Sequence, residues 1–287
     1  MEKLTGKVAV ITGGASGMGR AFADRFAAAG MSVVLGDIEE PVLAEAVAEL
    51  EATGVEVLGM RCDVSDHDSV LALRDATFDR FGAAHVVCLN AGVAGGGTIL
   101  EQTVNSWNWV LGVNLFGIVH GLDAFLPGLV EQDEGHVLMT ASIAGHLSIA
   151  GLAPYNASKH ATVTIAESLY AELQEAGSRV GVSCLCPGFV ATNIFTSERN
   201  RPEALLDAPV EPADPERELA RQALVEWMAA NALGADTVAD LVHDAVISDT
   251  FWIFTDDQHL EAVAERHGAI RERRNPVTGR LTEGLFD

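Results

Sequence analysis

The chain has 287 residues, of which 48% are hydrophobic, and its formal net charge is −23. This length and apolar content suffice for a sizeable core, and no linker rich in proline, serine or glycine divides the chain, so we expect a single domain. The acidic balance argues against nucleic acid and anionic membrane as partners, because both need a basic surface. We see no secretory signal and expect no membrane span, so the sequence predicts a soluble, cytoplasmic protein.

The cysteines and histidines give no support for a metal centre or a disulfide framework. None of the nine histidines forms a His-x3-His pair, and the cysteines lack the spacing of zinc ligands. We therefore expect no metal, and we expect the four cysteines to be buried, reduced thiols near strand ends. They are Cys62, Cys88, Cys184 and Cys186.

Apolar runs of strand length alternate with amphipathic segments of helix length along the whole chain. This alternation predicts an α/β fold: a Rossmann-type, doubly wound parallel sheet of about seven strands with helices on both faces. The expected strands are 8–12, 32–36, 55–61, 85–89, 136–140, 180–185 and 251–254. The expected helices are 17–29, 39–53, 66–81, 104–131, 155–176 and 237–248.

Two segments exceed a minimal fold of this kind. Residues 188–234 form a long excursion with prolines, acidic residues and two short helices, one of which carries Trp227 and Met228. Long insertions in compact domains are usually functional lids or disordered segments, and this one follows a strand end at the expected ligand edge, so we favour a substrate lid. The C-terminal extension 256–287 is expected to be a helix with a polar tail, which either covers a neighbour or extends freely.

Tyr155-Asn-Ala-Ser-Lys159 is the most informative motif. With two tyrosines and three lysines in the chain, chance would produce a Tyr followed four places later by a Lys only about 0.02 times. Residues four apart lie on one face of a helix, so the phenol and the ammonium can converge. A nearby cation favours the phenolate, which would make the tyrosine a proton acceptor. The alternative is an aromatic residue beside a lysine whose stem lies along the helix surface.

A glycine-rich turn follows the first expected strand and opens the first helix. Gly13, Gly17 and Gly19 lie where the chain must turn sharply. Glycine permits positive φ and close approach of a diphosphate, and the N-terminus of a helix favours negative charge. The spacing is Gly-x3-Gly-x-Gly rather than the Gly-x-Gly-x2-Gly of other dinucleotide folds. The position after a strand therefore supports the prediction more than the glycines do.

Asp37 ends the second expected strand, about twenty residues beyond the glycines. Its carboxylate can accept hydrogen bonds from both adenosine ribose hydroxyls and would repel a phosphate at the 2′ position. Ser16 and Ile38 stand where a basic residue would help such a phosphate. The sequence therefore predicts NAD rather than NADP. The alternative interpretation is that Asp37 caps the helix that begins near Glu39.

Two more segments follow strands at this same edge, where open parallel sheets bind ligands. They are Asp63-Val64 and Asn90-Ala91-Gly92, and either could also be an ordinary turn. In their order along the chain, the motifs from residue 7 to about residue 192 resemble the short-chain dehydrogenase/reductase family, in its branch of ordinary length. The resemblance extends over most of the chain, and the order of the motifs is more specific than any one of them.

The resemblance implies a role for each cofactor motif. Residues 12–19 would form the pyrophosphate turn, Asp37 the ribose anchor and 63–64 the adenine contact. Residues 90–92 would support the central sheet, and 187–192 would form the loop on the nicotinamide side. The implied cofactor-binding residues are Gly13, Ser16, Gly17, Met18, Gly19, Asp37, Ile38, Asp63, Val64, Asn90, Ala91, Gly92, Tyr155, Lys159, Pro187, Gly188, Val190 and Thr192.

Asn114, Ser142, Tyr155 and Lys159 match the catalytic tetrad of the family without substitution. The resemblance implies that Tyr155 takes the alcohol proton, with Lys159 and oxidised nicotinamide lowering the tyrosine pKa, while the cofactor accepts hydride. Ser142 would orient the substrate oxygen, and Asn114 would hold a water that links Lys159 to solvent. Ser142 as a turn residue and Asn114 as a surface polar residue remain alternatives.

Few charges surround the expected substrate pocket, which predicts an apolar, cyclic or aromatic secondary alcohol and its ketone rather than a sugar or a carrier-bound chain. Arg199 or Arg201 in the lid could still bind an anionic group. The predicted substrate contacts are Ser142, Tyr155, Phe189 and Phe195. Further residues expected around the pocket are 93–97, 143–152, Trp227 and Met228.

Two other functions stay open: an NAD-binding or sensing protein without turnover, and an epimerase or dehydratase of nucleotide sugars on the same scaffold. The second usually carries a larger C-terminal substrate domain than this chain has room for. The resemblance also implies a homodimer or homotetramer that pairs through the helices at 104–131 and 155–176. Small residues on the second helix would allow close approach, or would pack inside the subunit. They are Ala157, Ala161, Ala166 and Ala171.

Overall fold

Seven parallel strands form one sheet in the order β3-β2-β1-β4-β5-β6-β7. The computed structural model describes residues 1–276, apart from 2, 208–218, 220–221, 224–225 and 228–229. The predicted Rossmann-type sheet is confirmed, with strand bounds within two residues of those expected. The strands are β1 (Val8–Thr12), β2 (Ser32–Asp37), β3 (Val57–Arg61), β4 (Val86–Leu89), β5 (Gly135–Thr140), β6 (Val180–Cys186) and β7 (Trp252–Phe254).

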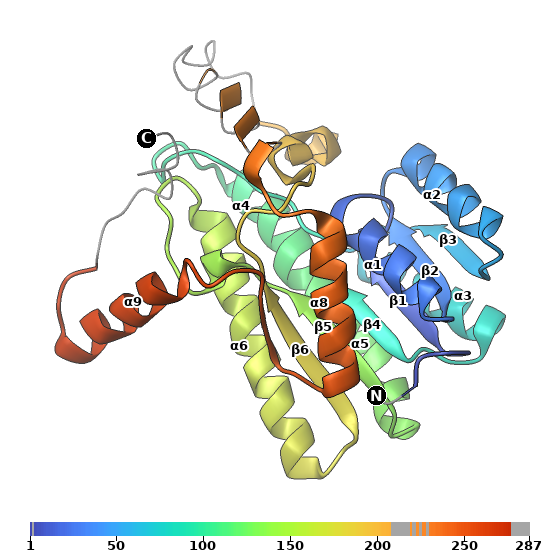
Figure 1. Cartoon of the computed structure of the whole chain (residues 1–287). Helices are drawn as coiled ribbons and strands as arrows, with labels where there is room; N and C mark the ends of the chain where they lie inside the picture. The colour runs from blue at the N-terminus through green and yellow to red at the C-terminus, as the bar shows by residue number, and fades with distance from the viewer. Residues whose placement is uncertain (2, 208–218, 220–221, 224–225, 228–229, 277–287) are drawn as a thin grey trace.

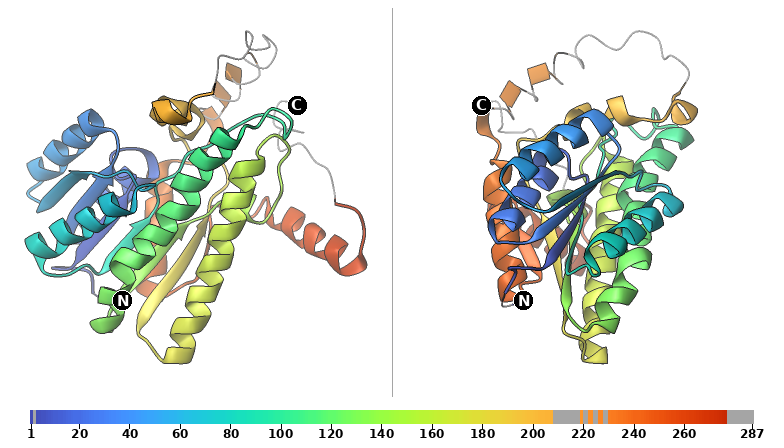
Figure 2. Two further views of the ribbon diagram at one scale, coloured as in Figure 1. Left: turned by 180° about the vertical axis from the view of Figure 1, so that it is seen from behind. Right: turned by 90° about the vertical axis from the view of Figure 1, so that its right-hand side faces the viewer.

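Helices cover both faces of the sheet (Figures 1 and 2). One face carries α1 (Gly17–Ala28), α2 (Glu40–Ala52) and α8 (Ala235–Ser248). The other carries α3 (His67–Phe81), α4 (Val104–Leu111), α5 (Gly117–Glu131) and α6 (Ala153–Ala176). Shorter helical turns lie between these elements, η2 (Ile143–Gly145) before α6, and η3 (Ile194–Asn200) and η4 (Glu203–Leu205) after β6.

The strands divide two apolar cores between them. Along β1, Ala9 and Ile11 pack toward α1 and α8, whereas Val8 and Val10 pack toward α3 and α5. Side chains of a strand alternate between the two faces, and here both faces are covered. This double burial explains why the strands read as continuous apolar runs rather than as alternating ones.

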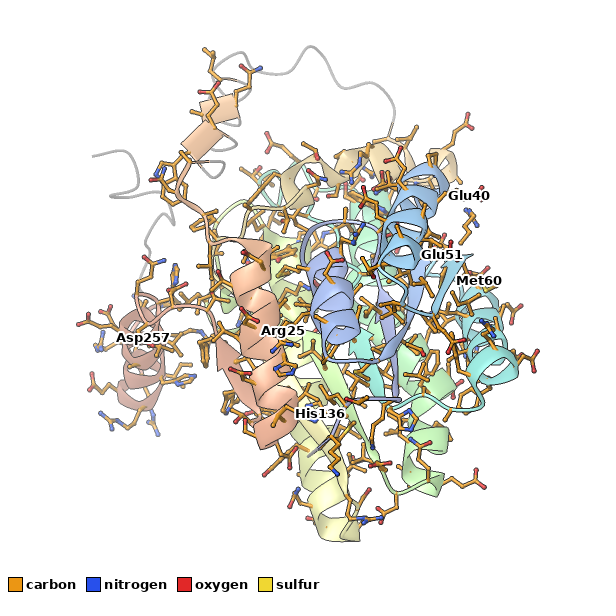
Figure 3. The ribbon with its side chains drawn as sticks, turned by 45° about the vertical axis from the view of Figure 1, so that its right-hand side comes forward. Arg25, Glu40, Glu51, Met60, His136 and Asp257 are labelled. Carbon is orange, nitrogen blue, oxygen red and sulfur yellow. The ribbon has the colours of Figure 1, made fainter. Side chains whose placement is uncertain are left out.

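Polar contacts at the helix surfaces complete the packing. Arg25 of α1 donates from Nε to Asp240 Oδ1 of α8 at 2.7 Å, and its side chain lies between these two helices (Figure 3). The N-terminal amine of Met1 donates to the Val246 carbonyl at 3.0 Å. The chain start is thereby held beside α8, at the end of the sheet opposite the strand carboxyl ends.

The strand order reverses between β1 and β4. The chain runs outward from β1 through β2 to β3, then returns to β4 on the other side of β1 and continues outward to β7. Helices diverge from the sheet at such a reversal and leave a crevice at the carboxyl ends of the strands. This is the edge at which the glycine turn and most predicted site residues lie.

The predicted helix 104–131 is continuous but not uniform, because α4 and α5 are joined by a π-helical turn, η1 (Gly112–Phe116). Within the described residues, Val104–Glu131 is long and apolar enough to cross a membrane by length and composition, with a mean hydropathy of 1.5. A core helix meets the same criterion, so the expectation of no membrane span stays a prediction. The helix packs against α3, α6 and strands β4 and β5, as a core helix does.

The excursion after β6 is closed at its base. Val190 and Leu233 form a parallel bridge, and Leu233 N donates to the Phe189 carbonyl at 3.0 Å. Beyond η3 and η4, the described positions between 219 and 231 are helical. Trp227 meets Phe189 edge to face at 5.4 Å between ring centroids, while the predicted contact Met228 lies outside the described residues.

The C-terminal extension contains the expected helix, α9 (Leu260–Glu272). It extends away from the body of the fold (Figures 1 and 2). The predicted polar tail falls mostly on residues 277–287, which lie outside the described part of the chain.

Candidate active site

The turn between β1 and α1 depends on its glycines. Gly13 and Gly17 adopt φ values of +64° and +55°, in the left-handed region that glycine enters at least cost. A Cβ on Gly19 would lie 2.0 Å from the Gly13 carbonyl oxygen. Gly19 is therefore required for the turn itself, and unlike the other two it does not line the cavity described below.

Asp37 is 8% exposed, and both of its carboxylate oxygens accept backbone N–H groups. Ala15 N donates to Oδ2 at 2.9 Å and Glu39 N donates to Oδ1 at 3.0 Å. The capping interpretation is thus partly right, since Glu39 immediately precedes α2. Each oxygen keeps a further lone pair, so the carboxylate can still accept ribose hydroxyls.

A single cavity runs along the carboxyl edge of the sheet. At one end it is lined by the glycine turn and Asp37, and at the other by Ser142, Tyr155 and Lys159. Every predicted cofactor-binding residue except Gly19 contributes to the lining, as do the predicted substrate contacts Phe189 and Phe195. An elongated dinucleotide fits this arrangement, because the glycine turn leaves space for phosphates at the N-terminus of α1.

Tyr155 and Lys159 are brought together on one face of α6, as their spacing predicts. Lys159 Nζ lies 5.6 Å from the centroid of the Tyr155 ring and donates to the Thr140 carbonyl at 2.8 Å. Burial lowers the pKa of Lys159 to about 8, while the neighbouring thiols Cys184 and Cys186 act in the opposite direction. Lys159 as a whole is 3% exposed, so its charge is weakly screened by solvent.

Burial raises the pKa of Tyr155, and a hydrogen bond from Ser142 opposes the rise. This direction is the reverse of the lowering that the family resemblance implies. The physical reason is that desolvation penalises the phenolate, while the Lys159 ammonium points at the Thr140 carbonyl rather than at the phenol oxygen. Ser142 also accepts from Ala144 N at 3.1 Å, which fixes its side chain at the start of η2.

Asn114 lies in the π turn, is 1% exposed and does not line the cavity. Its Oδ1 accepts from Val93 N at 2.8 Å, and its Nδ2 donates to the Val93 carbonyl at 2.9 Å and to Ser158 Oγ at 3.1 Å. Both amide hydrogens are therefore used within the protein. The side chain thereby joins the loop after β4 to α6, and the water expected at Asn114 stays a prediction.

Two threonines organise this edge: Thr140, which sequence reasoning missed, and Thr12, which it placed in the pyrophosphate turn without a role for the side chain. Thr140 accepts from Lys159 through its carbonyl, and its hydroxyl donates to Asn90 Oδ1 at 3.1 Å. Thr12 Oγ1 accepts from Asn90 N at 2.9 Å, and Asn90 Nδ2 donates to the Thr12 carbonyl at 3.1 Å. The sequence signal that could have identified the roles of Thr12 and Thr140 is that each is a polar residue at the carboxyl end of an otherwise apolar strand.

The predicted pocket residues separate into two groups. The residues that line the cavity are Val93, Ala94, Ile143, Ala144, Ile149 and Leu152. The rest of 93–97 and of 143–152 does not, and Trp227 contacts the lining residue Phe189. The turn η3 lies in the excursion after β6 and contributes to the cavity lining the residues Ile194, Phe195, Ser197, Arg199 and Asn200.

Comparisons with known proteins agree with this geometry. The family model described as short chain dehydrogenase matches residues 7–203. A short chain dehydrogenase/reductase from Burkholderia phymatum, solved in complex with NAD, is 44% identical with a TM-score of 0.93, covering 97% of this chain and 99% of that chain. This finding supports NAD as the cofactor.

Curated relatives carry the names of dehydrogenases and reductases. A "CLA biosynthesis dehydrogenase/reductase" of Lactiplantibacillus plantarum is 32% identical and covers 93% of both chains. A "1-deoxy-11-beta-hydroxypentalenate dehydrogenase" of Streptomyces avermitilis is 39% identical, and the match covers 86% of this chain and 83% of that relative. The chain therefore belongs to the short-chain dehydrogenase family, as its motifs predict.

Proposed function

We propose that the protein is an NAD(H)-dependent oxidoreductase that interconverts a secondary alcohol and its ketone. The observation that supports this most directly is the single cavity that joins Asp37 and the glycine turn to Ser142, Tyr155 and Lys159. When bound, NAD supplies the hydride acceptor or donor. Membership of a family whose relatives are dehydrogenases and reductases supports the same class of reaction.

The protein supplies the proton chemistry through Tyr155. For alcohol oxidation the phenolate takes the hydroxyl proton, and for ketone reduction the phenol returns it. Because burial raises the pKa of Tyr155, the phenolate needs stabilisation from the Ser142 hydroxyl and the Lys159 ammonium. Ser142 also orients the substrate oxygen, and Asn114 acts as a positioning residue through Val93.

The substrate is proposed to be apolar and cyclic or aromatic, with one oxygen as its polar handle. Apolar side chains dominate the lining near Tyr155, and pockets of this kind favour such ligands. They include Val93, Trp109, Ile149, Leu152, Phe189 and Phe195. The two lid arginines are already paired, Arg199 with Glu39 and Arg201 with Asp207, which disfavours a phosphorylated substrate.

Tyr155→Phe tests the assignment, since it keeps the ring and removes the proton acceptor. We expect NADH formation, followed at 340 nm with a panel of apolar secondary alcohols, to fall by about 10²- to 10⁴-fold. NADH binding, measured by fluorescence titration, should remain close to that of the wild type. Turnover comparable to the wild type in this variant would refute the mechanism.

The competing function, an NAD-binding protein without turnover, predicts a different result. The wild type would bind NADH in the titration yet oxidise no alcohol and reduce no ketone in the panel. The same panel with nucleotide sugars tests the epimerase or dehydratase alternative. We also propose a cytoplasmic location, to which the free, buried state of all four cysteines is suited.

A further inference from the structure

An ion pair joins the two walls of the cavity near Asp37. Arg199 in η3 donates from Nη2 to Glu39 Oε1 at 2.6 Å and from Nε to Oε2 at 3.2 Å, and Asn200 Nδ2 adds a bond to Oε1 at 2.9 Å. Glu39 lies just beyond Asp37, and its N–H is bonded to the Asp37 carboxylate. Both members of the pair line the cavity.

All three nitrogens of the Arg199 guanidinium donate within the protein. Besides its two bonds to Glu39, Nη1 donates to the Thr196 carbonyl at 2.9 Å, to Thr196 Oγ1 at 3.0 Å and to the Asn193 carbonyl at 3.4 Å. The bonds from Arg199, and to a smaller extent from Asn200, lower the pKa of Glu39. Glu39 is therefore an anion at neutral pH, and it neutralises Arg199.

Cations are scarce around this cavity. Among the described residues that line it, only Lys159 and Arg199 are cationic. Lys159 belongs to the opposite end, where the Thr140 carbonyl holds it. Among the described lining residues, Arg199 is thus the cation at the Asp37 end of the cavity, and arginine is the side chain best suited to bind a phosphate through two parallel bonds.

We propose that Glu39 is a specificity-determining residue that favours NAD over NADP by occupying Arg199. A 2′-phosphate would have to compete with the Glu39 carboxylate for the guanidinium, and it would add a third negative group beside Asp37 and Glu39. This selection acts in addition to the repulsion from Asp37. The inference rests on the proposed function in one respect, namely that the cavity binds a dinucleotide.

The test compares full-length wild type, Glu39→Gln, Arg199→Gln and the double variant. Glu39→Gln keeps an amide oxygen for Arg199 and Asn200 but removes the charge. For Glu39→Gln we expect the ratio of the NADH dissociation constant to the NADPH dissociation constant to rise at least fivefold over the wild type, which means relatively tighter binding of NADPH. Both constants are measured by fluorescence titration at one fixed ionic strength. In the double variant the shift should be clearly smaller than in Glu39→Gln, because the part that depends on the freed guanidinium is lost and only the relief of repulsion from Glu39 remains. Repeating the series in an Asp37→Ser background keeps NADPH binding measurable.

Several results would overturn the inference. They are an unchanged ratio in Glu39→Gln, a shift of the same size in the double variant as in Glu39→Gln, and equal weakening of both nucleotides. The last of these would mean that the pair only holds the lid. Arg179→Gln is the matched control, because its pair with Asp133 lies at the other end of β6 from the cavity; it should leave the ratio unchanged. A wild type that binds neither nucleotide would instead refute the proposed function.

Discussion

Lys159 shows what a single buried charge does to this protein. The residue is 3% exposed, its ammonium is held by one carbonyl, and burial lowers its pKa to about 8 from an ordinary value of 10.5. A depressed lysine pKa means that the unfolded chain binds more protons than the folded chain between these two pH values. Stability should therefore rise with pH in this window, and the residue costs stability at neutral pH.

Lys159→Met removes the charge while keeping the length of the side chain. We expect the free energy of unfolding of the wild type to gain up to about 3 kcal/mol from this residue between pH 8 and 10.5, a gain that the variant lacks. Urea unfolding at half-unit steps of pH measures the two slopes. At pH 7 the variant should be at least as stable as the wild type yet lose activity. Parallel pH slopes for the two proteins would contradict the burial of a charged lysine.

At the scale of the elements, the π turn η1 positions the loop that borders the cavity. Asn114 lies within this turn, and its amide satisfies both the N–H and the carbonyl of Val93. π turns inside α-helices are rare and occur mostly at functional sites. Here the turn directs the Asn114 amide toward the backbone of Val93, in the loop that follows β4.

Asn114→Ala should therefore damage both stability and activity. Two buried backbone groups would lose their partners, at a cost of about 1–3 kcal/mol each, and the loop that carries Val93 would lose its position beside Tyr155. Chemical denaturation measures the first effect, and kcat at saturating NAD measures the second. Ser158→Ala is the milder control, because it removes the bond from Asn114 at 3.1 Å and the bond from Ser158 Oγ to the Tyr155 carbonyl at 2.7 Å but leaves both backbone groups of Val93 satisfied. An unchanged kcat in Asn114→Ala would exclude the positioning role.

At the scale of the whole molecule, the exposed apolar side chains bear on assembly. Phe116 and Val119 are 50% and 40% exposed on the helix predicted to pair between subunits. Of the alanines predicted on α6, Ala166 is fully buried and packs inside the subunit, so it cannot serve an interface. Ala157 and Ala171 are exposed and Ala161 is half-buried, which keeps the predicted α6 surface available.

We expect the purified protein to be a homodimer or homotetramer by size-exclusion chromatography with light scattering. The pair Phe116→Glu and Val119→Glu should shift it toward smaller species, because charges buried in an interface cost affinity. Leu241→Glu, on α8 at the opposite face, is the comparison. Dissociation by that variant alone would assign the interface to the other face of the sheet.

The parts of this protein that its sequence determined are local or repetitive. The strands were predictable because burial on both faces makes each one an apolar run, and Tyr155 and Lys159 because four residues are about one helical turn. The glycine turn was predictable because Gly13 and Gly17 adopt conformations that other residues enter at a cost. Asp37 followed from its place at a strand end.

The rest depended on groups that are distant in the chain. The π turn and the amide of Asn114 require Val93, 21 residues away, and the pair of Arg199 with Glu39 spans 160 residues. The raised pKa of Tyr155 follows from desolvation, which exists only once the elements around it have come together. Contacts of this kind have no period or spacing in the sequence, because they arise where separate elements meet, and only the tertiary structure decided them.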